Sequence, residues 1–310
     1  MAARFWRSVL GLALVLAGLT GVFLARGLSL PSSTAVVIAL GMPPALFIAV
    51  VFSSFVIAQS ARYEHQQRCE PRNVLRALLS EIAEFPLAVM AMSLNARPQS
   101  QSSSPARAPG VAPDAVRPVL LLHGILCNAQ VWRGVQTRLR SAGFGPIEAL
   151  DVEPLLADIE LQARQVAPRL LALQRQCNGE RVIIIAHSMG GLIARALLRD
   201  LGASAIRRVV TIASPHHGTT MVRGLPWPDT RQMSRVSPWL GALNLAQEGR
   251  FTVPFASIFT GEDNLVAPAD SARLEGAELH ELHGVGHLGI LRSHRALDCV
   301  MTTLNQADPS

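Results

Sequence analysis

Two long apolar segments open the chain. Neither Ser8–Ala25 nor Ala35–Ala58 contains an Asp, Glu, Lys, Arg or His residue. A helix crosses the hydrocarbon core of a bilayer with about 20 mainly apolar residues, so both segments are near or above the length of a membrane span. Pro43 and Pro44 are expected to kink the second helix. The pattern predicts a hairpin of two transmembrane helices within residues 1–60.

The first segment is also compatible with a signal peptide, because Arg4 and Arg7 precede it as a basic leader would. Its end, Val22–Arg26, lacks the A-x-A pattern of small residues that marks a cleavage site. We therefore favour the hairpin. A signal peptide or anchor followed by a single span is the alternative.

Arginine asymmetry predicts the orientation of the hairpin. The short turn between the two segments holds only Arg26, whereas the flanks hold Arg4, Arg7, Arg62, Arg68, Arg72 and Arg76. Because basic residues are retained on the cytoplasmic side of a bilayer, both ends of the pair should face the cytoplasm. We expect a protein of the cell inner membrane with two spans and with the rest of the chain in the cytoplasm.

Residues 61–117 connect the hairpin to the remainder of the chain. The segment Val74–Leu94 is apolar but interrupted by charged residues and by Pro86, which predicts an amphipathic juxtamembrane helix. Residues 95–118 are rich in Ser, Pro, Ala and Gln, a composition typical of a flexible linker.

From residue 118 onward, short aliphatic runs alternate with longer helical patterns. The predicted strands are Val119–Leu122, Ile147–Leu150, Val182–Ala186, Val253–Thr260 and Glu278–His283. The predicted helices are Ala129–Ser141, Leu155–Gln176 and Leu192–Arg199. This alternation is typical of βαβ units around a parallel sheet, whose inner strands are apolar throughout. Residues 118–310 are therefore predicted to form one α/β domain.

Ser188 lies at a sharp turn between a predicted strand and a predicted helix. Such a turn needs small residues two positions before and after the serine, and these are Ala186 and Gly190. The usual residue at the first of these positions is Gly, but Ala is small enough. The turn raises the Ser188 hydroxyl above the sheet and places N–H groups of the helix start beside it, where an oxyanion would form. The pattern predicts a nucleophilic serine.

An acid and a histidine follow the serine in the chain. Asp263 comes at the end of the predicted strand Val253–Thr260, at the sheet edge where catalytic groups gather, and Glu262 is the competing acid. His287 lies in a glycine-flanked loop from which its ring can reach both Ser188 and Asp263. We assign Asp263 as the acid and His287 as the general base and then the general acid.

The other histidines near these motifs are expected to have structural roles. His187 adjoins the serine but should point off another side of the turn, and His216 and His217 are expected to shape the site. That pair lacks further ligands at a recognisable metal spacing. Surface or packing roles are expected for His280, His283 and His294. No metal ion and no cofactor is therefore expected.

Composition narrows the function classes. Only 16% of the 310 residues are charged while 49% are hydrophobic, which excludes a disordered chain and a collagen. The net charge of +6 comes from scattered arginines, since the chain contains no Lys, and no dense basic block suggests a nucleic-acid partner. An anionic membrane leaflet explains this charge better. The four cysteines show no C-x-x-C spacing, so neither a metal site nor a disulfide scaffold is indicated.

Five motifs together resemble the bacterial triacylglycerol lipases and esterases of the α/β-hydrolase fold. They are His123-Gly124-Ile125, Ala186–Gly191, Ser214–Thr219, Asp263–Val266 and His287-Leu288. The alanine before the serine motif is similar to the small Bacillus lipases, and the Ser-Pro-His segment resembles the Pseudomonas and Burkholderia lipases. The resemblance implies a catalytic triad of Ser188, Asp263 and His287. It also implies an oxyanion hole formed by the backbone amides of Ile125 and Met189.

The chain departs from the secreted Pseudomonas-type lipases in two respects. Those enzymes hold calcium partly through an Asp shortly after the catalytic histidine, whereas Leu288-Gly289 follows His287 here, so no calcium is expected. They also lack the hairpin of apolar segments. The segment Thr220–Arg250 is either a short lid over an acyl pocket or a surface insertion.

The expected activity is hydrolysis of a lipid or other acyl ester through an acyl-enzyme on Ser188. Two alternatives remain open. An alcohol or another acceptor could resolve the acyl-enzyme, which would make the protein a membrane acyltransferase. The domain could also be a non-catalytic binding module with a hydrolase fold.

Overall fold

A computed structural model describes residues 1–94, 116–247 and 250–307, and the predicted linker lies almost wholly outside these ranges. Within the described residues, the strands form one parallel sheet in the order β2-β1-β3-β4-β5-β6. Their bounds are β1 Val119–Leu122, β2 Ile147–Leu150, β3 Val182–His187, β4 Ile206–Ile212, β5 Phe255–Thr260 and β6 Glu278–Leu282. The predicted parallel α/β architecture is confirmed.

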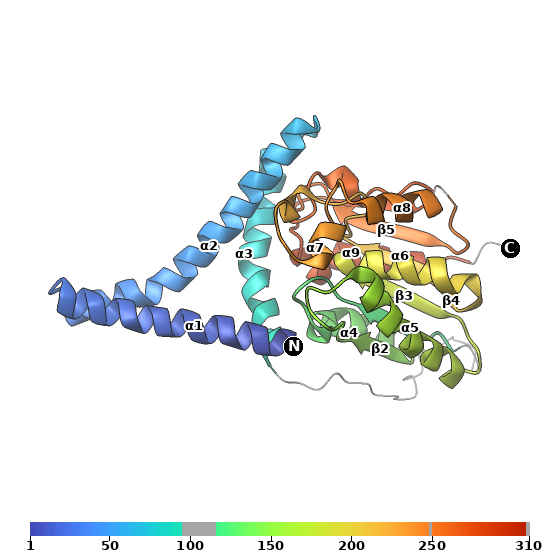
Figure 1. The fold of residues 1–310 in the computed structure, drawn as a ribbon, viewed down its shortest axis with the longest axis horizontal. Helices are drawn as coiled ribbons and strands as arrows, with labels where there is room; N and C mark the ends of the chain where they lie inside the picture. Colours follow the sequence, from blue (N-terminus) through green and yellow to red (C-terminus); the bar gives the residue numbers. More distant parts are fainter. Residues whose placement is uncertain (95–115, 248–249, 308–310) are drawn as a thin grey trace.

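Helices cover both faces of the sheet (Figure 1). One face carries α5 Ile159–Gln176, α6 Met189–Leu201 and α8 Pro238–Ala246, and the other carries α4 Arg133–Ser141 and α9 His294–Asn305. Along β3, Val182 and Ile184 pack on the first face and Ile183 and Ile185 on the second. Burial on both faces explains why this strand is apolar at every position before His187.

Two helices begin at different residues from those predicted. The helix α5 begins at Ile159 rather than Leu155, because the Asp158 side chain caps it by accepting a hydrogen bond from Leu161 N at 3.1 Å. The helix α6 begins at Met189 rather than Leu192, directly after Ser188. The predicted helix Ala129–Ser141 is divided into a 3₁₀ turn, η2 Ala129–Trp132, and the helix α4.

The segment predicted as a lid or a surface insertion contains three short helices, η4 Thr220–Val222, α7 Pro228–Gln232 and α8. Residues 248–249 near its end lie outside the described ranges. Leu240 and Leu243 of α8 are buried in the core cluster that also contains α6. The outer part of the segment, which includes Trp227 and Val236, is exposed. The helix α8 is therefore part of the core packing.

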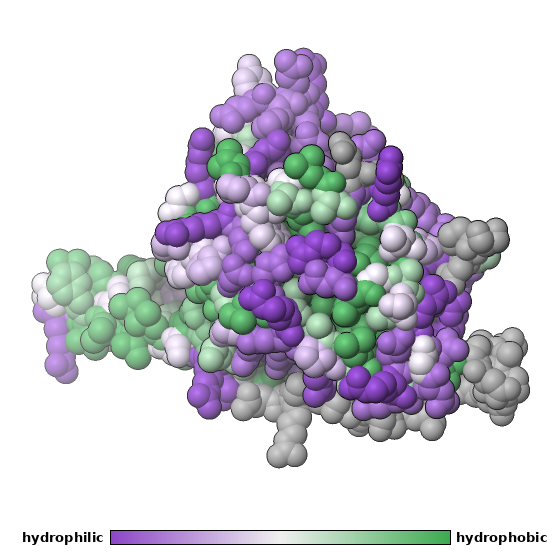
Figure 2. Space-filling view, turned by 45° about the vertical axis from the view of Figure 1, so that its right-hand side comes forward, coloured by the Kyte–Doolittle hydropathy of each residue, from purple (hydrophilic) through white to green (hydrophobic). Residues whose placement is uncertain are grey.

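The amino-terminal region contains three long helices, α1 Ala2–Val22, α2 Ser32–Glu64 and α3 Pro71–Ser93. A π-helical turn, η1 Phe23–Gly27, extends α1, and α2 continues unbroken through Pro43 and Pro44. The two apolar stretches, of 26 and 33 residues, are long and apolar enough to cross a membrane, a test that a signal sequence also meets. Figure 2 shows their apolar surface projecting from the α/β domain.

The helix α3 has the predicted amphipathic pattern, but its buried side packs against protein. Val89 and Met92 belong to the same core cluster as β1 and α9. The α1 helix also contacts the domain, because the indole of Trp6 donates a hydrogen bond to the carbonyl of Leu126 at 2.7 Å. The helix α3 thus lies along the α/β domain, whereas α1 and α2 touch the domain through part of their length and otherwise project away from it (Figure 1).

Candidate active site

Ser188 occupies a strained turn between β3 and α6. Its backbone has φ 55° and ψ −128°, a conformation that a residue with a Cβ rarely adopts. The neighbouring small residues are required by space, since a Cβ atom on Gly190 would lie 2.4 Å from the carbonyl oxygen of Leu122. Ala186 is completely buried. This is the strand-turn-helix geometry of a nucleophile elbow.

Backbone donors surround the Ser188 side chain. The loop after β1 passes so close that a Cβ atom on Gly124 would lie 2.7 Å from the Cβ of Ser188. Among the described residues, neither the Ile125 amide nor the Met189 amide donates to a protein acceptor. Two unengaged N–H groups therefore flank the serine from the loop and from the start of α6, as an oxyanion site requires.

Asp263 and His287 form a buried pair. Nδ1 of His287 lies 3.0 Å from Oδ1 and 2.9 Å from Oδ2 of Asp263. Asp263 also accepts hydrogen bonds from the backbone amides of Leu265 at 2.8 Å and Val266 at 2.7 Å. Burial opposes ionisation of Asp263, but the charge and hydrogen bond of His287 outweigh it and lower the pKa of this carboxyl.

The same contact stabilises the protonated form of His287. Burial alone would lower the pKa of His287, but the charge and hydrogen bond of Asp263 raise it above the usual value, and Glu81 adds to this effect. An ionised acid at Nδ1 leaves Nε2 available as the basic nitrogen. No hydrogen bond joins Ser188 to His287 in the described part of the chain, and such contacts are often loose without substrate.

His187 connects the turn at Ser188 to the loop after β6 that carries His287, which we call the histidine loop. Its ring centre lies 4.7 Å from that of His287, and its Nε2 lies 3.0 Å from the His287 carbonyl oxygen. Burial and the charge of His287 lower the pKa of His187 to about 3, so it is neutral and donates this hydrogen bond through Nε2–H. The residue next to Ser188 therefore positions the backbone of His287.

Glu262, the alternative candidate acid, forms contacts with Gly284 and His283 and not with His287. Its Oε2 accepts a hydrogen bond from the Gly284 amide at 2.9 Å, and its Oε1 lies 3.3 Å from Nδ1 of His283. Glu262 thus ties the loop after β5 to the loop after β6. Of the two candidate acids, Asp263 is the one in contact with His287.

Three of the other histidines, His216, His217 and His280, contact groups outside the Asp263–His287 pair. The buried His216 pairs through Nε2 with Thr211 Oγ1 at 3.0 Å, and His217 lies 3.3 Å from the amide of Asn244. His280 contacts Glu278, and His294 begins α9. The residues that the structure describes contain no cluster of three or more side chains suited to a metal ion.

Sequence reasoning missed the contribution of the amino-terminal helices to this site. Arg62 of α2 is fully buried and donates a hydrogen bond to the carbonyl of Asp263. Asn264 donates to Ser54 of α2 at 3.0 Å and accepts from the His287 amide at 3.1 Å. Glu81 of α3 accepts hydrogen bonds from two amides that follow His287. The available sequence signal for these contacts was a charged residue in or next to an otherwise apolar helical pattern. The sequence pattern does not reveal which residues such a charged group contacts.

A family description of a PGAP1-like alpha/beta domain matches residues 147–276. Protein SERAC1 of Danio rerio is 32% identical over 169 residues, which cover 44% of this chain and 26% of that protein. A triacylglycerol lipase of Pseudomonas fragi is 28% identical over 112 residues, covering 34% of this chain and 36% of the lipase. The chain thus spans about a quarter and about a third of the length of these relatives.

Two solved lipase structures have the same fold. Aspergillus fumigatus lipase B superposes with a TM-score of 0.57 and 20% identity, covering 70% of this chain and 64% of that one. The mature Bacillus licheniformis lipase BlEst2 superposes with a TM-score of 0.54 and 16% identity, covering 64% of this chain and 96% of that one.

Proposed function

We propose that this chain is a lipase- or esterase-like α/β-hydrolase that cleaves carboxylic esters through a triad of Ser188, Asp263 and His287, an interpretation that its similarity to lipases supports. The strongest support is the buried Asp263–His287 pair in the same site as a serine held at φ 55°. The order of these residues in the chain, serine, acid and histidine, is that of the fold.

The first half of the proposed reaction forms an acyl-enzyme. Nε2 of His287 removes the proton from Ser188 as Oγ attacks the ester carbonyl carbon. The amides of Ile125 and Met189 donate hydrogen bonds to the resulting oxyanion. The tetrahedral intermediate then collapses, and the alcohol leaves with the proton held by His287. Asp263 remains ionised and holds the Nδ1–H of the imidazolium.

The second half releases the acid. His287 removes a proton from a water molecule, which attacks the acyl carbon, and Ser188 leaves as the proton returns to its Oγ. The same two amides stabilise the second oxyanion.

The proposed substrate is a lipid ester reached from a membrane. Two apolar helices, α1 and α2, are long enough to span a bilayer, and a triacylglycerol lipase is among the relatives. We place residues 1–60 in the cell inner membrane as a hairpin, with residues 61–117 as the connection and the catalytic domain, residues 118–310, in the cytoplasm. The arginines that flank the hairpin support this orientation.

Hydrolysis of p-nitrophenyl acyl esters tests the proposal. The purified full chain should cleave them, and Ser188→Ala should lower kcat by about 10⁴-fold or more, because serine and histidine act as a unit. Equal rates for the two proteins would refute it. Product analysis with an added alcohol separates hydrolysis from acyl transfer, since a transferase would form the new ester in preference to the free acid.

A further inference from the structure

The loop that carries His287 lies unusually close to α3. A Cβ atom on Gly286 would lie 2.1 Å from Cγ of Glu81, and one on Gly289 would lie 2.1 Å from the hydroxyl oxygen of Ser80. Only residues without a Cβ fit these two positions unless α3 or the loop moves. The glycines on either side of His287 thus serve the contact with α3.

Glu81 occupies the centre of this contact. Its side chain is only 1% exposed, and Oε1 accepts hydrogen bonds from the amides of Leu288 and, at 3.2 Å, Gly289. These are the two residues that directly follow His287. The α3 helix therefore fixes the backbone of the histidine loop through one carboxylate.

The charge of Glu81 has an unusual environment. Among the described residues, no arginine forms an ion pair with it, and the charged groups that act on it from the domain are His287 and Asp263. Burial raises the pKa of Glu81 to about 7, with His287 opposing that rise. The groups that act electrostatically on His287 are Asp263 and Glu81, and the ring of neutral His187 packs beside it.

A purely structural role does not require a carboxylate at this position. A glutamine would offer the same acceptor oxygen to Leu288 and Gly289 without the cost of burying a charge. The one positive charge that forms beside Glu81 in the proposed reaction is the imidazolium of His287. A buried carboxylate is stabilised by such a charge and stabilises it in return.

We propose that Glu81 of α3 is a positioning residue for His287, which orders the histidine loop through two backbone hydrogen bonds and stabilises the imidazolium by its charge. This inference rests on the proposed function. Through Glu81, α3, the helix that follows the proposed hairpin, contributes to the geometry and charge of the proposed active site.

The substitution Glu81→Gln tests the charge while keeping the acceptor oxygen. Loss of the negative charge should lower the pKa of His287. The acid limb, the low-pH side of the pH dependence of kcat/KM on which activity is lost as His287 is protonated, should therefore move to lower pH by about 0.5 to 1 pH unit. Since an imidazolium forms in the transition state, kcat should fall about 3- to 30-fold while KM changes less than about 2-fold.

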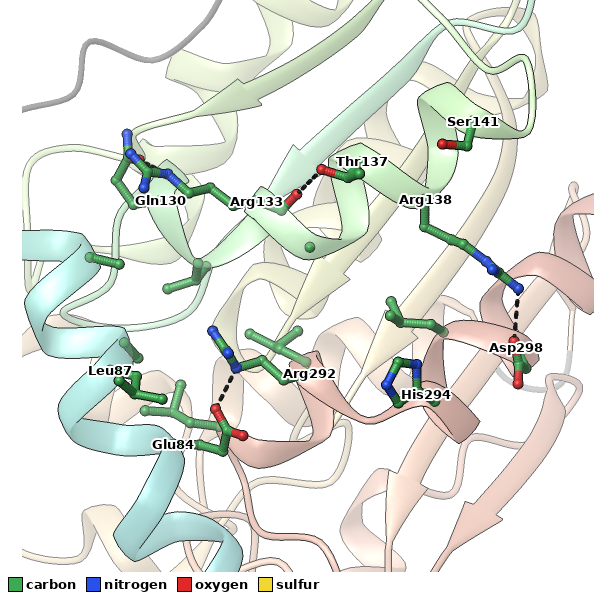
Figure 3. Close-up of a pocket in the computed structure, with 17 residues that line it drawn as sticks. Glu84, Leu87, Gln130, Arg133, Thr137, Arg138, Ser141, Arg292, His294 and Asp298 are labelled. Carbon is green, nitrogen blue, oxygen red and sulfur yellow. Dashed lines mark hydrogen bonds and ion pairs between the residues drawn. The ribbon is translucent and has the colours of Figure 1, made fainter. Parts of the chain in front are cut away.

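Glu84→Gln is the matched control, with the same chemical change one turn further along α3. Glu84 pairs with Arg292 in an open groove between α3, α4 and α9, and this groove does not contain the three triad residues (Figure 3). The acid limb of this variant should coincide with that of the wild type.

Glu81→Asp separates charge from geometry. It keeps the negative charge, so its acid limb should remain within about 0.3 pH unit of the wild type even if kcat falls because the shorter side chain holds the loop less well. This variant also preserves the test if Glu81→Gln folds poorly.

Two measurements keep the inference apart from the proposed function. The pH dependence should be recorded both for ester hydrolysis and for the rate at which a fluorophosphonate labels Ser188. If the wild type shows no labelling that depends on Ser188, the proposed function fails and the inference fails with it. If Ser188 is labelled but the acid limb is the same in the wild type, Glu81→Gln and Glu84→Gln, the role of Glu81 alone is overturned.

Discussion

The backbone of Ser188 has a positive φ, a conformation that costs about 1–3 kcal/mol and persists only where the surroundings enforce it. Here the Ser188 amide donates to the carbonyl of Ile212 at 2.9 Å, and Gly190 allows α6 to begin against the carbonyl of Leu122. The cost is consistent with a functional role, because a relaxed turn would not raise the hydroxyl above the sheet.

Gly190→Ala tests the requirement for space at the elbow. Its methyl group would meet backbone oxygen atoms of Leu122 and His123, which cannot rotate away as a side chain could. We expect a loss of about 2–4 kcal/mol in the free energy of unfolding and at least a 10²-fold loss of esterase activity. Denaturant unfolding and ester hydrolysis measure the two effects.

Gly134→Ala in α4 is the matched control for this substitution. A Cβ atom at Gly134 meets nothing within 4 Å, so the change should be neutral or stabilising by up to about 1 kcal/mol. Equal stability of both variants and the wild type would show that the space around Gly190 is not limiting.

At the scale of elements, local pattern predicted β3, the elbow and the sheet, because an apolar run, a small-residue turn and a helix are each encoded by neighbouring residues. The pattern misplaced the start of α5, where the Asp158 cap sets the first turn. The contact between Asp263 and His287 could be predicted from their chain order. The contacts of Glu81 and Arg62 could not, since each joins residues about 200 positions apart, and hydrophobic periodicity carries no information about such pairing.

Arg62→Gln tests the contact between α2 and the loop after β5 that carries Asp263, which we call the acid loop. Arg62 is fully buried and donates to the carbonyl of Asp263, so its removal should leave this acceptor without its partner and lower the free energy of unfolding by about 1–3 kcal/mol. The acid loop should also become less ordered, with a measurable loss of kcat. Thermal unfolding in detergent reports the first effect.

The exposed Arg68, just beyond the end of α2, provides the control. Arg68→Gln should change stability by less than about 0.5 kcal/mol. Indistinguishable melting of Arg62→Gln, Arg68→Gln and the wild type would contradict a structural role for the buried arginine.

At the scale of the whole molecule, the three amino-terminal helices contact the loops that form the candidate site. α2 contacts the acid loop and α3 contacts the histidine loop, while Trp6 of α1 contacts the loop after β1. A hydrolase domain attached to a membrane by a separate linker would lack these contacts. The amino-terminal helices and the geometry of the site are therefore coupled in this protein.

The proposed orientation predicts that the carboxyl terminus is cytoplasmic. A green fluorescent protein fused after Ser310 should fluoresce, and alkaline phosphatase fused at the same position should be inactive, because arginines flank the hairpin on that side. Phosphatase fused within the turn at Leu30 should be active. An active phosphatase at the carboxyl terminus would contradict the proposed orientation.

The most direct test of the central claim is the mass of the fluorophosphonate-treated protein from the membrane fraction. The account predicts one adduct per chain, located on Ser188 and absent from Ser188→Ala, with parallel loss of ester hydrolysis. An unlabelled wild-type chain, or equal labelling and hydrolysis in Ser188→Ala, would contradict it.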